Sequence, residues 1–303
     1  MGKTGRKSKL IPVLILLIAA LLLVDGTLLL TERKIASLQH SAAELPQKTA
    51  ALQEKLQEDT LALKQLQEES EKMDHLDEAA EEKKAEFFRH AKELEDKVRN
   101  GESDVKIAYL TFDDGPYRDT TGTFLDILQQ YDILATFFYL EKDGRDDLYR
   151  RVIDSGHTLA NHTASHDLSS GGIYRSVDTF IADVQENRSF IQDRFGYTTT
   201  ILRFPGGSSQ ARDLKGPIVE RLREMGYGYV DWDTTTGDGR NSGTVEEYIH
   251  GVLDVSADYS INVVLMHDYS VNTHKALPTI IEGMQEQGYI FLPLFYDSYK
   301  IKK

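Results

Sequence analysis

The chain has 303 residues, of which 40% are apolar, and a formal charge of −14. This length suits one large domain or two smaller ones, and the apolar content is ample for a globular core. The acidic balance argues against a nucleic-acid partner, because neutralising phosphates requires a basic surface. Cysteine is absent, so disulfides and thiolate metal ligands are excluded. Any bound metal must therefore have histidine and carboxylate ligands.

The first thirty residues have the pattern of a membrane-targeting segment. Residues 1–9 are basic, and residues 10–30 are apolar except for three residues near their end. About 20 apolar residues span a bilayer and about 7–15 form the core of a signal peptide, so the uninterrupted run 10–24 is compatible with both. No small-residue cleavage site follows the run cleanly, and the positive charges favour a cytoplasmic N-terminus. We expect an uncleaved single-pass anchor at 10–30, with residues 1–9 in the cytoplasm and everything after residue 30 outside the cell.

Residues 31–100 have the composition of a long helix. They are rich in Glu, Gln, Lys, Ala and Leu, and Pro46 is their single proline. Every seventh residue from Leu38 to Leu94 is apolar except Asp59. The second heptad position, which starts at Ile35, contains more polar residues, so its hydrophobic pattern is weaker. We expect a helical, coiled-coil-like stalk, which at 1.5 Å per residue would extend on the order of 100 Å. Self-association through these heptads stays open.

Beyond residue 100, short apolar runs alternate with helical patterns. Strands are expected at 107–112, 135–140, 158–160, 201–204, 228–230, 262–266 and 288–291, and helices at 121–131, 148–154, 177–195, 217–225, 245–255 and 277–287. Such alternation is typical of a parallel βα sheet. For a domain at 101–303 we expect an α/β fold, an open or incomplete (β/α) barrel with functional groups at the carboxyl ends of its strands.

Two adjacent carboxylates, Asp113 and Asp114, end the first expected strand, and a Gly-Pro turn follows at once. Adjacent residues on a strand point in opposite directions, so both can serve one site only if the strand already turns there. One carboxylate can then bind a metal while the other acts as a base.

A second polar stretch contains His162 and His166. Their i, i+4 spacing predicts that both imidazoles lie on one face of a helical turn, as in zinc enzymes. Catalytic zinc requires three protein ligands and an open position, and a neighbouring carboxylate can take a proton from water. Two histidines and one aspartate would supply these ligands.

Three further strand ends carry polar residues: Arg203–Gly207, Asp231–Gly239 and Leu265–Asp268. Together, the motifs Thr-Phe-Asp-Asp-Gly-Pro, His-Thr-x-x-His, Arg-x-Pro, the Asp-rich segment and Leu-Met-His, in this order, resemble the polysaccharide deacetylases of the NodB-homology type, carbohydrate esterase family 4. The resemblance covers about residues 104–297. It implies a distorted, partly open (β/α) barrel, a divalent metal that is usually zinc, and removal of N- or O-acetyl groups from glycans. Cobalt, nickel or manganese are also compatible with such a ligand set.

The resemblance also implies roles for individual residues. Asp113 corresponds to the general base, and Arg203 to the arginine that pairs with this base and orients it. The metal ligands would be Asp114, His162 and His166. His267 corresponds to the general acid that protonates the leaving amine.

The partner of this acid is left open between Asp238, which we prefer, and Asp233. Leu265 would line the pocket for the acetyl methyl, and the backbone N–H near Gly206 would help to bind the oxyanion. Many family members have an aromatic residue in place of Gly206 and a tryptophan in place of Gly239. The only tryptophan of this chain, Trp232, is a further candidate for substrate binding.

The expected function is that of a metal-dependent deacetylase anchored in the cell membrane and acting outside the cell on N-acetylglucosamine of peptidoglycan. Alternative substrates are N-acetylmuramic acid, poly-N-acetylglucosamine and acetylated xylan, and a different class of function is a glycan-binding membrane scaffold without turnover. A zinc peptidase is disfavoured because no glutamate follows His162. A phosphoesterase is disfavoured because the sequence has no second metal cluster.

Overall fold

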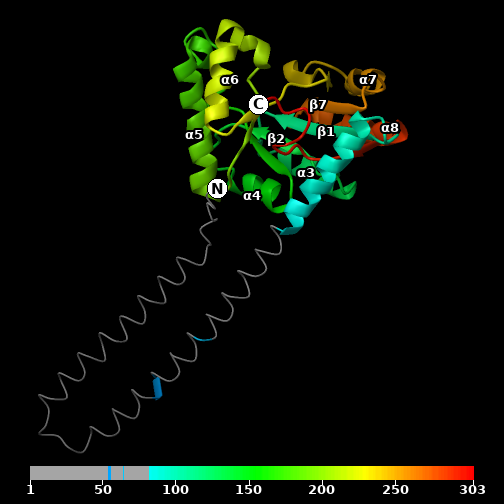
Figure 1. Ribbon diagram of the computed structural model, residues 1–303, viewed down its shortest axis with the longest axis horizontal. Coiled ribbons are helices and arrows are strands. Elements are labelled where there is room, and N and C mark those ends of the chain that lie inside the picture. The colour runs from blue at the N-terminus through cyan, green and yellow to red at the C-terminus, as the bar shows by residue number, and fades with distance from the viewer. Residues whose placement is uncertain (1–53, 56–63, 65–81) are drawn as a thin grey trace, which may run out of the picture. The chain divides into compact units, whose positions relative to one another are not determined.

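The computed structural model describes residues 54–55, 64 and 82–303 (Figure 1). The predicted anchor at 10–30 and most of the predicted stalk lie outside these residues. The parts of the stalk that are described, 54–55, 64 and 82–99, are helical. None of the described helices combines the length and the apolar character that crossing a membrane requires.

Strands and helices alternate through the rest of the chain. The strands are β1 (Lys106–Asp113), β2 (Thr136–Tyr139), β3 (Thr158–Asn161), β4 (Ile201–Leu202), β5 (Gly228–Tyr229), β6 (Thr234–Thr235), β7 (Ile261–His267) and β8 (Tyr289–Phe291). The α-helices are α3 (Thr121–Gln130), α4 (Asp146–Asp154), α5 (Val177–Phe195), α6 (Lys215–Glu224), α7 (Val245–Ser256) and α8 (Val271–Glu286). Short 3₁₀ segments occupy Ile173–Arg175, Ser208–Leu214 and Asp238–Arg240.

The strands form one parallel sheet in the order β5-β4-β3-β2-β1-β7-β6, and β8 pairs with the first residues of β1. Among the described strands, β5 and β6 end the sheet without pairing to each other, so the barrel is open. The predicted open (β/α) barrel is therefore confirmed. The register places Asp113 of β1 beside Phe138 of β2 on one side and His267 of β7 on the other.

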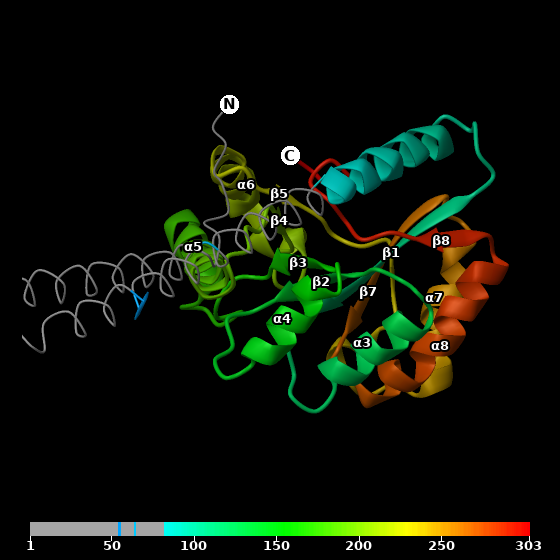
Figure 2. The same cartoon turned by 90° about the horizontal axis from the view of Figure 1, so that it is seen from below.

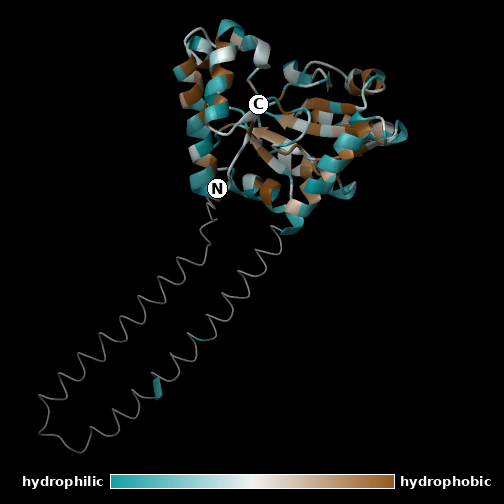
Figure 3. Ribbon diagram, viewed as in Figure 1, coloured by the Kyte–Doolittle hydropathy of each residue, from teal (hydrophilic) through white to brown (hydrophobic). Residues whose placement is uncertain are grey.

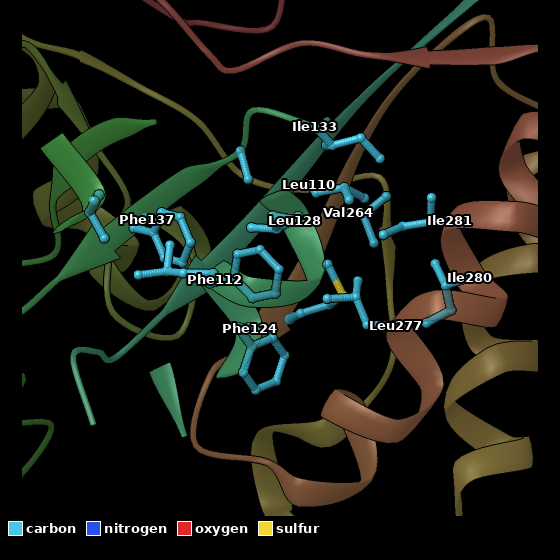
Figure 4. Packing of buried hydrophobic residues seen from close by; sticks show 14 of the residues in the cluster. Leu110, Phe112, Phe124, Leu128, Ile133, Phe137, Val264, Leu277, Ile280 and Ile281 are labelled. Atoms are coloured by element: carbon cyan, nitrogen blue, oxygen red, sulfur yellow. The ribbon is translucent and has the colours of Figure 1, made fainter. Parts of the chain in front are cut away.

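The outer face of the sheet is apolar and is covered by helices. Leu110 and Phe112 of β1 pack there with Phe124 of α3 and with Leu277 and Ile280 of α8 (Figure 4). Figure 3 shows the corresponding apolar colour on the central strands. Because side chains alternate along a strand, Ile107, Tyr109, Thr111 and Asp113 all face the opposite, inner side.

The inner face is filled below the site by the helical residues 87–99 and by the C-terminal segment. Ala91 and Val98 of this helix join Ile107, Tyr109 and Phe295 in one buried cluster. Figure 2 shows this helix across the sheet from α3 and α8. The compact unit accordingly begins at Phe87, before the boundary at residue 101 that the sequence had suggested.

A buried carboxylate joins this helix to both the barrel and the chain's end. Glu95 is fully buried; it accepts a hydrogen bond from the Tyr109 hydroxyl and lies 3.1 Å from the donating Tyr299 backbone N. Burial raises the pKa of Glu95 above its ordinary value. A buried polar group is tolerated where it is hydrogen-bonded. These contacts therefore favour the one position of the helix against the barrel in which Glu95 reaches both partners.

Two elements differ from the sequence-based expectation. The last helix begins at Val271 and not at Leu277, because the Ser270 side chain caps it by accepting from the Thr273 backbone N at 3.2 Å. Strand β6 was missed because Thr234–Thr235 is too short to produce an alternating pattern.

Removing the helix of residues 82–99 should destabilise the barrel. A fully buried large apolar side chain contributes about 1.5–3 kcal/mol, so a loss of roughly 3 kcal/mol is a modest expectation for this helix. In a domain of this size that loss lowers Tm by about 6–12 °C. Calorimetry on fragments 82–303 and 101–303 measures the difference, and equal Tm values would show that the helix contributes nothing to the fold.

Candidate metal centre and active site

A left-handed backbone at Asp114 separates the two adjacent carboxylates. Asp113 ends β1 with its side chain directed to the inner face, and Asp114 follows with φ of 70°. The Asp114 backbone N donates to the Phe138 carbonyl at 3.1 Å, which secures this turn against β2. The two side chains consequently have different partners, as their different expected roles require.

The histidine pair lies on a loop and not on a helical turn, so that part of the sequence-based prediction was wrong. His162 directly follows β3, and the chain then passes through left-handed conformations at Thr163 (φ of 67°) and His166 (φ of 53°). These turns bring the two rings together, with centroids 5.1 Å apart. The i, i+4 spacing therefore identified two histidines that do meet, but left-handed loop turns and not a helical turn bring their rings together.

Asp114, His162 and His166 converge. One potential ligand atom from each lies within 4.8 Å of the others, and Asp114 Oδ1 is 3.4 Å from the Nε2 atom of both histidines. His162 Nδ1 lies 2.8 Å from the Arg203 carbonyl oxygen. A carbonyl can only accept, so Nδ1 donates this hydrogen bond and Nε2 is the ring nitrogen that faces Asp114.

These three residues fit a divalent cation. Asp114 Oδ1 is buried and accepts no hydrogen bond of ordinary length from the described residues. Burial raises the pKa of Asp114, but the hydrogen bond and charge of His162, together with the charges of His166 and His267, lower it below its ordinary value. Burial, and then His162, lower the pKa of His166. A carboxylate and two imidazoles form a ligand set suited to zinc.

Asp113 is paired with a buried arginine. Its Oδ1 accepts from Arg203 Nη1 at 2.8 Å, and both side chains are buried. Arg203 also donates to the Thr111 hydroxyl at 2.7 Å and to the Asp231 carbonyl at 3.2 Å, which fixes the guanidinium group. Asp113 Oδ2 stands 3.7 Å from His162 Nε2, beside the proposed ligands.

The structure places Asp238, and not Asp233, against His267. Asp238 Oδ1 lies 2.7 Å from His267 Nδ1, and Oδ2 accepts from the His267 backbone N at 2.9 Å. Asp233 is instead paired with Lys300 at 2.8 Å. Burial lowers the pKa of His267, but the hydrogen bond and the charge of Asp238 have the opposite effect. Overall, the pKa is raised from its ordinary value to about 9. His267 Nε2 is 3.8 Å from Asp114 Oδ2, so a charged imidazole faces the proposed metal centre.

The three predicted substrate-binding residues lie on three different segments of the chain. Leu265 lies two residues before His267 on β7 and is therefore on the same face of the sheet. Gly206 is exposed with φ of 69°, and Trp232 lies over the adjacent Gly207, where an added Cβ would be 3.0 Å from the indole. The tryptophan ring thus occupies the space beside this glycine pair.

Two polar residues at the same edge were missed. Asp268, which the sequence analysis gave no role, is fully buried and accepts from Thr121 at 2.5 Å and Tyr139 at 2.9 Å. Lys142 Nζ donates to the Asp114 carbonyl at 2.5 Å. The position of Asp268 directly after a strand-ending histidine was a usable signal, whereas Lys142 stands in no motif.

Comparisons with known proteins agree with this geometry. The polysaccharide deacetylase family model matches residues 100–230. YheN of Bacillus subtilis, named as a polysaccharide deacetylase, is 34% identical over 210 residues that cover 66% of this chain and 70% of YheN. A peptidoglycan-N-acetylglucosamine deacetylase of Bacillus cereus is 30% identical over 193 residues, 61% of this chain and 68% of that protein.

A solved structure is also similar. The catalytic domain of peptidoglycan N-acetylglucosamine deacetylase from Eubacterium rectale has a TM-score of 0.60 and 34% identity, covering 66% of this chain and 93% of that one. The region matched by the family model contains Asp113, Asp114 and the histidine pair. The chain belongs to the polysaccharide deacetylase family.

Proposed function

We propose that the protein is a metal-dependent hydrolase that removes the N-acetyl group from N-acetylglucosamine in peptidoglycan, with zinc as its metal. Family membership supports the reaction class, and relatives named for this substrate support the glycan. The observation that carries the proposal is the separation of roles at the end of β1. Asp113 pairs with Arg203 while Asp114 turns to the two histidines.

Hydrolysis of an acetamide requires a nucleophile made from water, a stabilised oxyanion and a protonated leaving amine. A bound divalent cation supplies Lewis-acid chemistry: it polarises a carbonyl and lowers the pKa of water. Asp113 accepts the proton of the attacking water, and the hydrogen bond from Arg203 Nη1 at 2.8 Å keeps its carboxylate oriented. His267, charged at neutral pH beside Asp238, donates a proton to the nitrogen as the carbon–nitrogen bond breaks. The products are acetate and a free amine.

The proposed cellular location of the enzyme is inferred from the sequence. The basic residues 1–9 and the apolar run 10–30 favour an anchor in the cell membrane with the barrel outside the cell. There the enzyme would meet wall glycan. Other acetylated glycans, and a scaffold that binds glycan without turnover, remain as outcomes that the following experiments distinguish.

Replacing the proposed base should abolish turnover while sparing the metal. With full-length protein stripped of metal and then given zinc, we expect acetate release from purified peptidoglycan. In the Asp113→Asn protein this rate should fall about 10²–10⁴-fold with zinc binding retained, because one general base contributes about that much. His162→Ala should lose zinc binding as well. The exposed Asp258→Asn variant is the matched control.

The pattern of released products identifies the substrate. Mass spectrometry of the digested wall locates the free amine on N-acetylglucosamine or on N-acetylmuramic acid, and only the first result fits the proposal. Acetate from N-acetylglucosamine oligomers or acetylated xylan alone would change the substrate. If the protein binds zinc and glycan but releases no acetate from any glycan, it is a binding scaffold without turnover.

The alkaline limit of activity should depend on Asp238. Because Asp238 raises the pKa of His267, Asp238→Asn should lower that pKa, so the acid form is lost at lower pH. The alkaline limb of the kcat/KM profile, which reports the free enzyme, should therefore move to lower pH. Asp233→Asn should leave the limb in place, and a shift in that variant would assign the partner role to Asp233.

The proposed anchor has its own test. Full-length protein should stay in the membrane fraction after carbonate extraction, and a version lacking residues 1–30 should be released. Protease added outside intact cells should cleave the barrel. A soluble mature protein that lacks the apolar run would show instead that the segment is a cleaved signal peptide.

A further inference from the structure

A strained residue stands between the two histidines of the proposed metal centre. Thr163 has φ of 67°, a left-handed conformation that β-branched residues rarely adopt. Such conformations persist only where the surroundings impose them. His162 and His166 flank this turn, so whatever maintains it also determines where their ring nitrogens lie.

Two fully buried asparagines bind both backbone polar groups of Thr163. The Asn161 side-chain oxygen accepts from the Thr163 N at 2.8 Å, and Asn187 Nδ2 donates to the Thr163 carbonyl at 2.9 Å. Asn161 belongs to β3, directly before His162, whereas Asn187 comes from α5, distant in sequence. The turn is thus fixed from both sides.

Asn187 connects this turn to the neighbouring strand. Its Nδ2 also donates to the Tyr139 carbonyl at 2.8 Å, and that carbonyl accepts from the His162 backbone N at 3.2 Å. A third acceptor, Asn161 Oδ1, lies 3.3 Å away. All these partners are acceptors, so the amide nitrogen must face them and a carboxylate at this position would meet only oxygen atoms.

One turn earlier on the same face of α5, Asp183 binds the rest of the loop. Its Oδ1 accepts from the backbone N of Ala164 at 2.7 Å and of Ser165 at 2.9 Å. Residues four apart lie on one face of a helix, so α5 presents Asp183 and Asn187 together. The whole segment between the two histidines is therefore bonded to this helix.

We infer that Asn187, assisted by Asp183, is a positioning residue of the metal centre: by fixing the left-handed Thr163, it holds His162 and His166 in the geometry that binds the ion. This inference rests on the proposed metal-dependent function. Neither side chain is a ligand or touches the reacting atoms. Residues that orient metal ligands typically change metal affinity about 10–100-fold when they are replaced.

The test is the zinc affinity of full-length protein, measured without substrate by competition with a chromophoric chelator. Asn187→Ala should weaken zinc binding about 10–100-fold. Asp183→Ala, at a partly exposed site, should weaken it less and serves as the second variant if Asn187→Ala does not fold. Asn262→Ala is the matched control, because Asn262 is also fully buried and accepts from Thr234 Oγ1 at 3.0 Å, but lies near the opposite end of β7 from His267.

A double-mutant cycle separates positioning from general destabilisation. Glycine adopts positive φ without strain, so Asn187→Ala should cost less zinc affinity in a Thr163→Gly protein than in the wild type. Wild-type affinity in folded Asn187→Ala, or in Asp183→Ala if the first does not fold, would overturn the inference, as would an equal loss in Asn262→Ala. Failure of the wild type to bind zinc would instead contradict the proposed function, and the inference with it.

Discussion

The left-handed turn at Asp114 is the constraint on which the site depends. On a regular strand, Asp113 and Asp114 would point to opposite faces of the sheet. The turn, with φ of 70°, instead brings Asp114 to the histidines while Asp113 stays on the inner face with Arg203. One strand end can therefore supply both a metal ligand and a base. The parallel register adds His267 from the adjacent strand.

The inner face of the barrel combines an apolar lower part with a polar upper part. Below the site, Ala91, Val98 and Phe295 fill the space between the strands, so the segment preceding the predicted domain belongs to its core. Above them, Arg203 is fully buried yet bonded to a carboxylate, a hydroxyl and backbone carbonyls. A buried charge with such partners is a fixed group, and this orients Asp113 without the help of solvent.

Sequence reasoning predicted local patterns well and long-range contacts poorly. The alternation of β1 and the strand-ending motifs were sufficient for the open barrel and for the residues at its carboxyl edge, because those signals are contiguous in sequence. The sequence favoured Asp238 over Asp233, as the structure confirms, but deciding between them needed the path of the segment after β5. Asn187 lies in the middle of an ordinary helix pattern, and only the fold shows that its amide reaches Thr163. The histidine pair was identified by its spacing, although a loop and not a helix produces its geometry.

The central claim is that the two adjacent aspartates have different roles, and a crystal structure of zinc-loaded protein with anomalous diffraction at the zinc edge tests it most directly. We predict one strong peak within about 2.0–2.2 Å of Asp114 and of an imidazole nitrogen of both His162 and His166, with Asp113 still bonded to Arg203 and outside ligand distance. A peak coordinated by Asp113, or a zinc ion bound away from the histidine pair, would contradict this account.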